Sequence, residues 1–216
     1  MDESSGAGAR SQAPKGAPKS PPFPTGKDKY FRVSGHPRPM TIKDTVRTVG
    51  DLMELAARTA PKGLGQDFIE IKVLTDEERI ALGNDMLEIS KERSNYGFER
   101  DGRNVLGSDA VVLIGLLPHK GAGLNCQACG FASCAEFNER SSHGEFDGPN
   151  CAIRLLDLGI ALGSAAKIAS DLNVDNRITY RIGVPAKRLG ISKANISHGI
   201  PLSATGKNIY FDRSKK

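Results

Sequence analysis

The sequence predicts an α+β (mixed α/β) fold, and two observations carry this prediction. From residue 41 onward, segments with helical spacing alternate with short strand-like runs, which argues against a β-sandwich or a helical bundle. The run 110–114 is continuously apolar, as expected for a strand that is buried on both faces of a sheet. The chain of 216 residues, with 38% hydrophobic and 25% charged residues, suits a globular protein with one core.

Three elements are predicted ahead of that strand. Apolar residues recur at helical spacing over 41–60, and apolar and charged residues then alternate over 69–73, as in a strand. Thr75 and Glu78 form a capping box, which predicts the start of a second helix. This second helix is expected to end within 94–97.

The segments after the strand at 110–114 have a different character. Residues 152–170 are apolar nearly all round, with Gly159 and Gly163 four positions apart, which predicts a central helix approached closely by another backbone or by a ligand. Residues 177–182 alternate like a strand, 185–189 is predicted as a short helix, and 209–211 has strand character.

All cysteines of the chain fall between the strand at 110–114 and the helix at 152–170. They form the pattern C-x2-C-x4-C-x16-C, made by Cys126, Cys129, Cys134 and Cys151. Disulfides are typical of small secreted domains, and this N-terminus lacks the pattern of a signal peptide. Structural zinc sites usually combine two matched pairs, whereas the last two cysteines here are sixteen residues apart. An iron-sulfur cluster, with three thiolates from a tight loop and one from a distant element, fits best, and zinc stays an alternative.

The cysteine segment resembles the 4Fe-4S module of the electron-transport B-subunit family and of the corrinoid iron-sulfur protein. The likeness rests on the spacing, on Asn125 before the first cysteine, on Gly130 after the second and on the hexapeptide CGFASC. It implies one 4Fe-4S cluster with all four cysteines as ligands. The run of bacterial two-cluster ferredoxins is absent, since Ala132 and Ala152 depart from it.

A wider stretch, from about residue 45 to the C-terminus, resembles the uncharacterised prokaryotic ferredoxin-domain proteins, which are found largely in anaerobes. The motifs that carry the likeness are 124–126, 148–151, 157–164, 174–177 and 199–203. This family implies a cluster without naming a reaction.

A weaker likeness concerns the domain around the cysteines. The segment 57–63 followed by a strand, together with the small-residue helix at 152–170, is similar to flavin-dependent nitroreductases. Those are α+β dimers that bind FMN at the subunit interface. The likeness implies a nitroreductase-like sheet-and-helix domain with an inserted iron-sulfur loop. It also makes FMN a candidate cofactor and a homodimer a candidate assembly. The expected arginine-rich phosphate motif is missing, so the cations that could serve an FMN phosphate or ring are Arg58, Lys62, Lys207 and Arg213.

The sequence thus predicts a tail at 1–29 without a core and a single globular domain at 30–216, with the 4Fe-4S module embedded at about 108–168. No apolar run is long enough to span a membrane and no basic run suggests nucleic acid, so a cytoplasmic protein is expected. The histidines have no metal-ligand spacing and are interpreted as surface residues; they are His36, His119, His143 and His198.

Three functions are compatible with these observations. The first is one-electron transfer between the cluster and a redox partner protein. The second is an FMN-dependent oxidoreductase that the cluster supplies with electrons, and the third is a structural zinc module with an interaction role. Whether the chain is an enzyme stays open at this stage.

Overall fold

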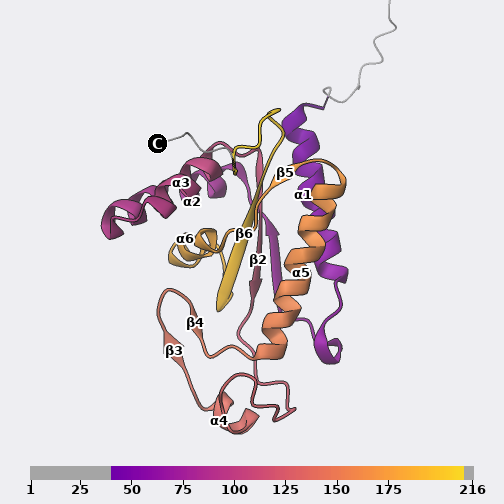
Figure 1. The fold of residues 1–216 in the computed structure, drawn as a ribbon, viewed down its shortest axis with the longest axis vertical. Helices are drawn as coiled ribbons and strands as arrows, with labels where there is room; N and C mark the ends of the chain where they lie inside the picture. The colour runs from indigo at the N-terminus through magenta and orange to yellow at the C-terminus, as the bar shows by residue number, and fades with distance from the viewer. Residues whose placement is uncertain (1–39, 212–216) are drawn as a thin grey trace, which may run out of the picture. The chain divides into compact units, whose positions relative to one another are not determined.

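A four-stranded sheet organises the computed structural model, which describes residues 40–211 (Figure 1). The strands are β1 (Ile69–Val73), β2 (Ala110–Leu116), β5 (Asp175–Asn176) and β6 (Ile196–Ser203), and they lie in the order β1-β2-β6-β5. All neighbouring strands are antiparallel. Every residue of β2 is buried, because strands flank it on both edges and helices cover both faces. The predicted α+β fold is confirmed.

The first face of the sheet is covered by α1 (Ile42–Thr59) and α5 (Ala152–Asp171). Side chains alternate along a strand, so Ala110, Val112 and Ile114 point to this face and share one core with the two helices. Met53 of α1 is among the fully buried residues of this core.

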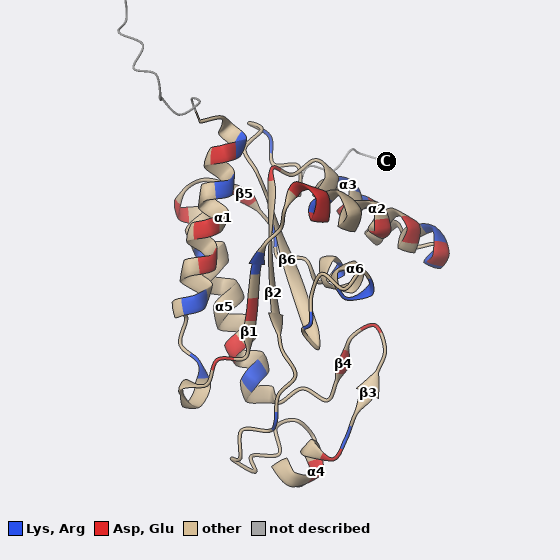
Figure 2. Cartoon of the chain, turned by 180° about the vertical axis from the view of Figure 1, so that it is seen from behind, with Lys and Arg blue, Asp and Glu red and all other residues tan. Residues whose placement is uncertain are grey.

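The opposite face is covered by α2 (Asp76–Arg93), α3 (Tyr96–Leu106) and the short α6 (Gly183–Arg188). Val111 and Leu113 of β2 point to this second core. The colours of Figure 2 mark charged residues along α1 and α2, whereas β2 between the two layers contains none.

The remaining elements lie at the lower end of the sheet in Figure 1. They are the helix α4 (Cys134–Asn138) and the two-stranded hairpin of β3 (Ser142–His143) and β4 (Asp147–Gly148). Two 3-10 turns complete the chain, η1 (Gly63–Gly65) after α1 and η2 (Tyr180–Ile182) before α6.

Most of the predicted elements are present. The helix expected at 41–60, the strand at 69–73, the buried strand at 110–114 and the helix at 152–170 correspond to α1, β1, β2 and α5. The Thr75–Glu78 capping box is formed in both directions, and α2 ends where Ser94 takes the left-handed conformation.

Two strand predictions were wrong. Residues 177–182 contribute only the bridge between Thr179 and Gly199, after which the chain turns through η2 into α6. Residues 209–211 form a turn that holds Tyr210 in the protein, where its hydroxyl lies 2.9 Å from Ser108 Oγ. In both places long-range packing overrides the local alternation of side chains.

Strand β6 and helix α3 were not predicted. Gly199 and Pro201 make β6 look unlike a strand, yet each has a place in it. A Cβ at Gly199 would lie 2.2 Å from Ile182, so only glycine fits there, and β5 pairs with Leu202 and Ser203 but not with Pro201.

Another helix does approach α5 closely, since α1 packs against it, but it does not do so at the two glycines. A Cβ at Gly159 or Gly163 would meet nothing within 4 Å. The predicted tail at 1–29 lies outside the described residues. Within 40–211, no helix is both long and apolar enough to cross a bilayer.

Candidate metal centre

The four cysteines gather at the lower end of the sheet, on the segment that joins β2 to α5 (Figure 1). Cys126 and Cys129 lie on the loop after β2, Cys134 is the first residue of α4, and Cys151 is the N-cap of α5. All four thiols are free of disulfides. Exposure falls along the series, from exposed Cys126 to Cys151, which is 4% exposed.

A side chain beside the first cysteine shapes this loop. Asn125 has the left-handed backbone conformation, with φ of 48°, which asparagine tolerates better than most residues. Its Oδ1 accepts a hydrogen bond from the backbone N–H of Cys134 at 2.9 Å. The loop therefore folds back on the start of α4, and this hydrogen bond links the residue before Cys126 to Cys134.

Gly121 is needed where the incoming chain passes α4. A Cβ there would lie 3.1 Å from the Cβ of Cys134 and 3.3 Å from its Sγ. The Gly121 N–H donates to Asn138 Oδ1 at 2.8 Å, and the Gly130 N–H donates to the Gln127 carbonyl at 2.9 Å. These two glycine amides thus have acceptors inside the loop.

His119 connects this loop to the fourth cysteine. Its Nδ1 lies 2.8 Å from the Leu117 carbonyl, and its Nε2 accepts a hydrogen bond from the Cys151 N–H at 3.0 Å. Both contacts are satisfied when the proton is on Nδ1, that is, by a neutral ring. Burial lowers the pKa of His119, and the Arg154 guanidinium lowers it further, against the hydrogen bond to Leu117. The interpretation of His119 as a surface residue was wrong.

Arg154 fixes the start of α5 to the turn at η1. Its side chain is 1% exposed and donates to the Gly63 carbonyl at 2.7 Å and to Oε1 of Gln66. Asp157 faces the guanidinium at 3.3 Å and accepts from the Gly63 N–H at 2.8 Å. The Phe68 ring lies against the same guanidinium, 4.9 Å from its central carbon. This buried pair holds the helix that begins at Cys151.

The cysteines have the chemistry to bind a cluster, but in this structure they are not arranged to bind one together. Among residues 40–211, no three His, Cys, Asp or Glu side chains stand close enough together to hold a metal ion. The donor chemistry suits a thiolate-bound centre, since the four free thiols share one segment and three of them are exposed or partly exposed. Joint ligation requires the thiols to come closer together than they are in this structure.

Of the cations predicted for FMN, Arg58, Lys62 and Lys207 lie within the described residues, the first two near one end of the sheet and Lys207 beyond the other. Arg58 donates to the Ile69 carbonyl at 3.0 Å, and Lys62 donates to backbone carbonyls at the end of α1. Lys207 follows the end of β6, which is the opposite end of the sheet from Ile69. Arg213 lies outside the described residues.

Sequence reasoning did not find the residues that support the cysteines. Asn125 was noted only as part of a motif, and Arg154, Asp157 and Asn138 were not singled out. Only Asn125 could have been found from the sequence, because it directly precedes a cysteine. The contacts of His119 and Arg154 join residues 32 and 91 positions apart.

Comparison with known proteins identifies the family. Residues 147–213 match the family described as "Uncharacterized protein containing a ferredoxin domain (DUF2148)". An uncharacterized protein from Archaeoglobus fulgidus is 48% identical over 172 residues, which are 79% of this chain and 93% of the relative. The chain belongs to this ferredoxin-domain family. Membership indicates an iron-sulfur redox role, while the matched residues include Cys151 and not the other three cysteines.

The chain is also similar to some solved structures that are named as flavin-bound or as flavoproteins. A nitroreductase with bound FMN from Desulfitobacterium hafniense is 19% identical, covers 74% of this chain and 78% of its own, and gives a TM-score of 0.47. A flavoprotein from Clostridium difficile is 16% identical, with coverages of 78% and 84% and a TM-score of 0.46. These likenesses concern the chain path, and no ligand of this protein follows from them.

Proposed function

We propose that this ferredoxin-domain protein holds one 4Fe-4S cluster on Cys126, Cys129, Cys134 and Cys151 and exchanges single electrons with a protein partner. The observation that carries the proposal is that all four cysteines of the chain are free and lie on one segment at one end of the sheet. When bound, the cluster supplies one-electron chemistry. Cytoplasmic location, an anaerobic host and the absence of a nucleic-acid role are parts of the same proposal.

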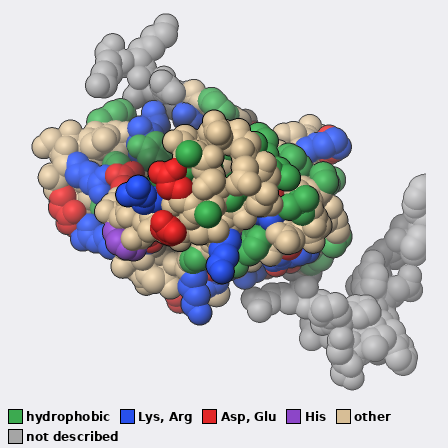
Figure 3. All heavy atoms as spheres, turned by 90° about the horizontal axis from the view of Figure 1, so that it is seen from below, with side chains coloured by type: hydrophobic (Ala, Val, Ile, Leu, Met, Phe, Trp, Pro, Cys, Tyr) green, Lys and Arg blue, Asp and Glu red, His purple; other side chains and the backbone are tan. Residues whose placement is uncertain are grey.

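The protein's own residues have supporting roles in this proposal. His119 holds the amide of Cys151, Asn125 holds the amide of Cys134, and the Arg154–Asp157 pair anchors the helix behind them. The exposed position of Cys126 leaves the centre within reach of a partner. Figure 3 views the molecule from below, and basic and acidic side chains both occur on the face that it shows. A partner selected by one sign of charge is therefore not favoured.

The test is an anaerobic purification followed by absorption spectroscopy and by iron, sulfide, zinc and flavin analysis. The proposal expects a brown protein with iron and sulfide in equal amounts. Single replacements of the four cysteines by serine should each remove or convert the cluster, whereas Ser141→Ala, at an exposed position beyond α4, should leave it unchanged. A colourless protein with stoichiometric zinc would establish the structural zinc alternative instead.

The flavin alternative has its own readout. Denaturation of an FMN-dependent oxidoreductase would release flavin in proportion to protein. An iron-replete and flavin-free preparation would remove this alternative. Within one chain the separation of Arg58 and Lys62 from Lys207 does not support it.

We also propose a homodimer that packs through α5. Leu156 and Ile160 are 63% and 44% exposed on this helix, and Gly159 and Gly163 lie beside them with open space above. From Leu158 to Ala166 the helix carries no charge, so a second copy could approach without setting like charges against each other.

A further inference from the structure

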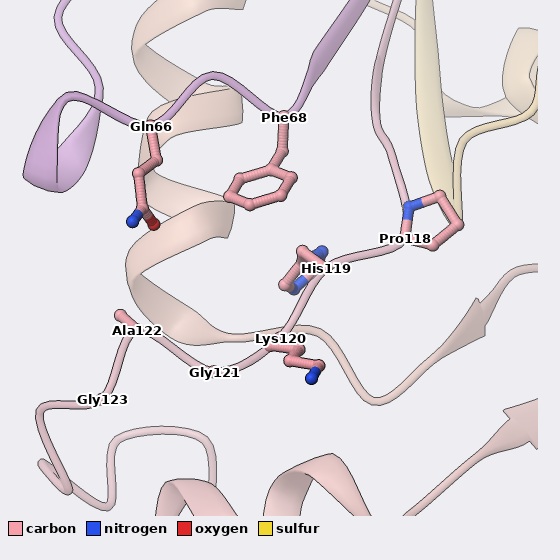
Figure 4. A pocket seen from close by; sticks show the side chains of 8 residues that line it. All are labelled: Gln66, Phe68, Pro118, His119, Lys120, Gly121, Ala122 and Gly123. Atoms are coloured by element: carbon pink, nitrogen blue, oxygen red, sulfur yellow. The ribbon is translucent and has the colours of Figure 1, made fainter.

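An open pocket lies against the segment that leads from β2 to the cysteines (Figure 4). Its volume is about 700 Å³, within the range of small-molecule sites. One wall is made by residues 118–123, which run directly toward Cys126. The other wall is made by Gln66 and Phe68, which precede β1.

The pocket offers flat apolar surfaces. The rings of Phe68 and His119 both face it, with centroids 6.0 Å apart and planes tilted by 54° (Figure 4). Both nitrogens of His119 lie within hydrogen-bond distance of backbone groups, so the ring offers a ligand mainly its face and carbon edge. The guanidinium of Arg154 behind Phe68 keeps that ring in place. The two rings touch each other at an angle, so a planar conjugated ligand would stack on the side of this pair that lines the pocket.

The polar groups of the pocket select for negative charge. Lys120 contributes an ammonium group, and no carboxylate belongs to the lining. Gln66 has its Oε1 engaged by Arg154, so the group it can turn to a ligand is the Nε2 donor. Donors and a cation without an acidic counterpart favour a ligand whose edge is anionic or rich in acceptors.

We propose that this pocket binds a small planar aromatic anion, of the class of anthraquinone sulfonates and related conjugated acceptors. The ligand would lie against the pocket side of Phe68 and His119, with its anionic edge toward Lys120 and Gln66. Because His119 contacts the Cys151 amide, the bound molecule would sit beside the cysteine segment. The further role of an electron acceptor rests on the proposed function, whereas binding itself does not.

The test is calorimetric titration of the full-length protein with anthraquinone sulfonate and with the neutral hydroxymethylanthraquinone. The wild type should bind one molecule of each per chain. Lys120→Ala should weaken the sulfonate about tenfold, the loss expected for one charge-assisted contact, and leave the neutral compound unchanged. Phe68→Leu should weaken both compounds about three- to tenfold, since both lose the aromatic face. Lys167→Ala, at the exposed far end of α5, is the matched control and should change neither.

Absence of saturable binding by the wild type would overturn the inference, and so would equal effects of Lys120→Ala and Lys167→Ala. Far-ultraviolet circular dichroism and thermal unfolding on each variant separate lost binding from lost folding. Iron and sulfide are measured on the same preparations. Dye binding by a protein without iron would defeat the cluster proposal alone, and an iron-replete protein that binds no dye would defeat the pocket alone.

Discussion

His119 Nε2 accepts a hydrogen bond from the backbone N–H of Cys151, over a distance of 3.0 Å. The same ring bonds the Leu117 carbonyl, so one side chain ties the residue after β2 to the start of α5. Phe137 of α4 stacks on it, with ring centroids 6.2 Å apart. The most buried cysteine is therefore held by a residue 32 positions away, which makes His119 a positioning residue for the proposed centre.

Replacement His119→Phe should keep the ring packing and remove both hydrogen bonds. The Cys151 N–H would then be left without its partner, which destabilises by about 1–3 kcal/mol. Urea unfolding should show this loss, and iron and sulfide per chain should fall. His143→Phe is the control, because His143 is exposed on the hairpin and should change neither quantity. Full cluster content with unchanged stability in His119→Phe would contradict the positioning role.

The Arg154–Asp157 pair gives a second prediction. Arg154→Met should destabilise the protein by about 3–5 kcal/mol, because Asp157 would remain as a buried charge without its partner. The double variant Arg154→Met, Asp157→Leu should recover much of the loss, since neither buried charge remains. Urea unfolding of the single and double variants measures this coupling.

The control for this pair lies on the same helix. Lys167 and Asp171 form an exposed ion pair at the other end of α5, and Lys167→Ala should cost less than about 1 kcal/mol. Equal losses for the buried and the exposed pair would show that Arg154 does not anchor the helix.

The parts of the fold that the sequence predicted are those with local causes. The Thr75–Glu78 capping box and the continuous apolar run of β2 depend on residues within a few positions of each other. The parts that it missed depend on distant ones. Glycine is required at position 199 of β6 because Ile182 packs closely against it, and His119 is half-buried where Cys151 returns to it after the hairpin.

The candidate site also has a part that the sequence predicts and a part that it does not. Cysteine spacing indicated the proposed ligands, since four thiols within twenty-six residues are visible in the chain itself. The pocket beside them joins residues 66–68 to residues 118–123, which come together only through the pairing of β1 with β2. No pattern in the sequence places Phe68 opposite His119.

His198 of β6 predicts how stability depends on pH. Burial lowers its pKa below the unfolded value of about 6.5, and its Nδ1 is buried without a hydrogen-bond partner. As the pH falls through about 6.5, the unfolded chain takes up a proton that the folded protein resists, so stability is lost. Each unit of pKa depression corresponds to about 1.4 kcal/mol.

His198→Phe should therefore lose less stability than the wild type between about pH 7.5 and pH 5.5, as measured by urea unfolding across that range. Ser141→Ala serves as control, because that side chain is exposed, does not titrate and should leave the shape of the stability curve as in the wild type. Parallel stability curves for wild type and His198→Phe would show that this histidine does not contribute.

The outer face of α5 provides the last prediction. Glycine within a helix destabilises it by about 1 kcal/mol relative to alanine, and none of the described residues 40–211 packs against a Cβ placed at Gly163. In a homodimer the glycine would allow the backbones of two α5 helices to approach closely. Gly163→Leu should then convert a dimer into a monomer in sedimentation velocity without lowering the thermal midpoint of the monomer, since open space accepts the side chain. Lys91→Leu, on the exposed surface of α2, should leave the dimer intact. A wild type that stays monomeric at all concentrations, or a Gly163→Leu variant that still dimerises, would exclude this interface.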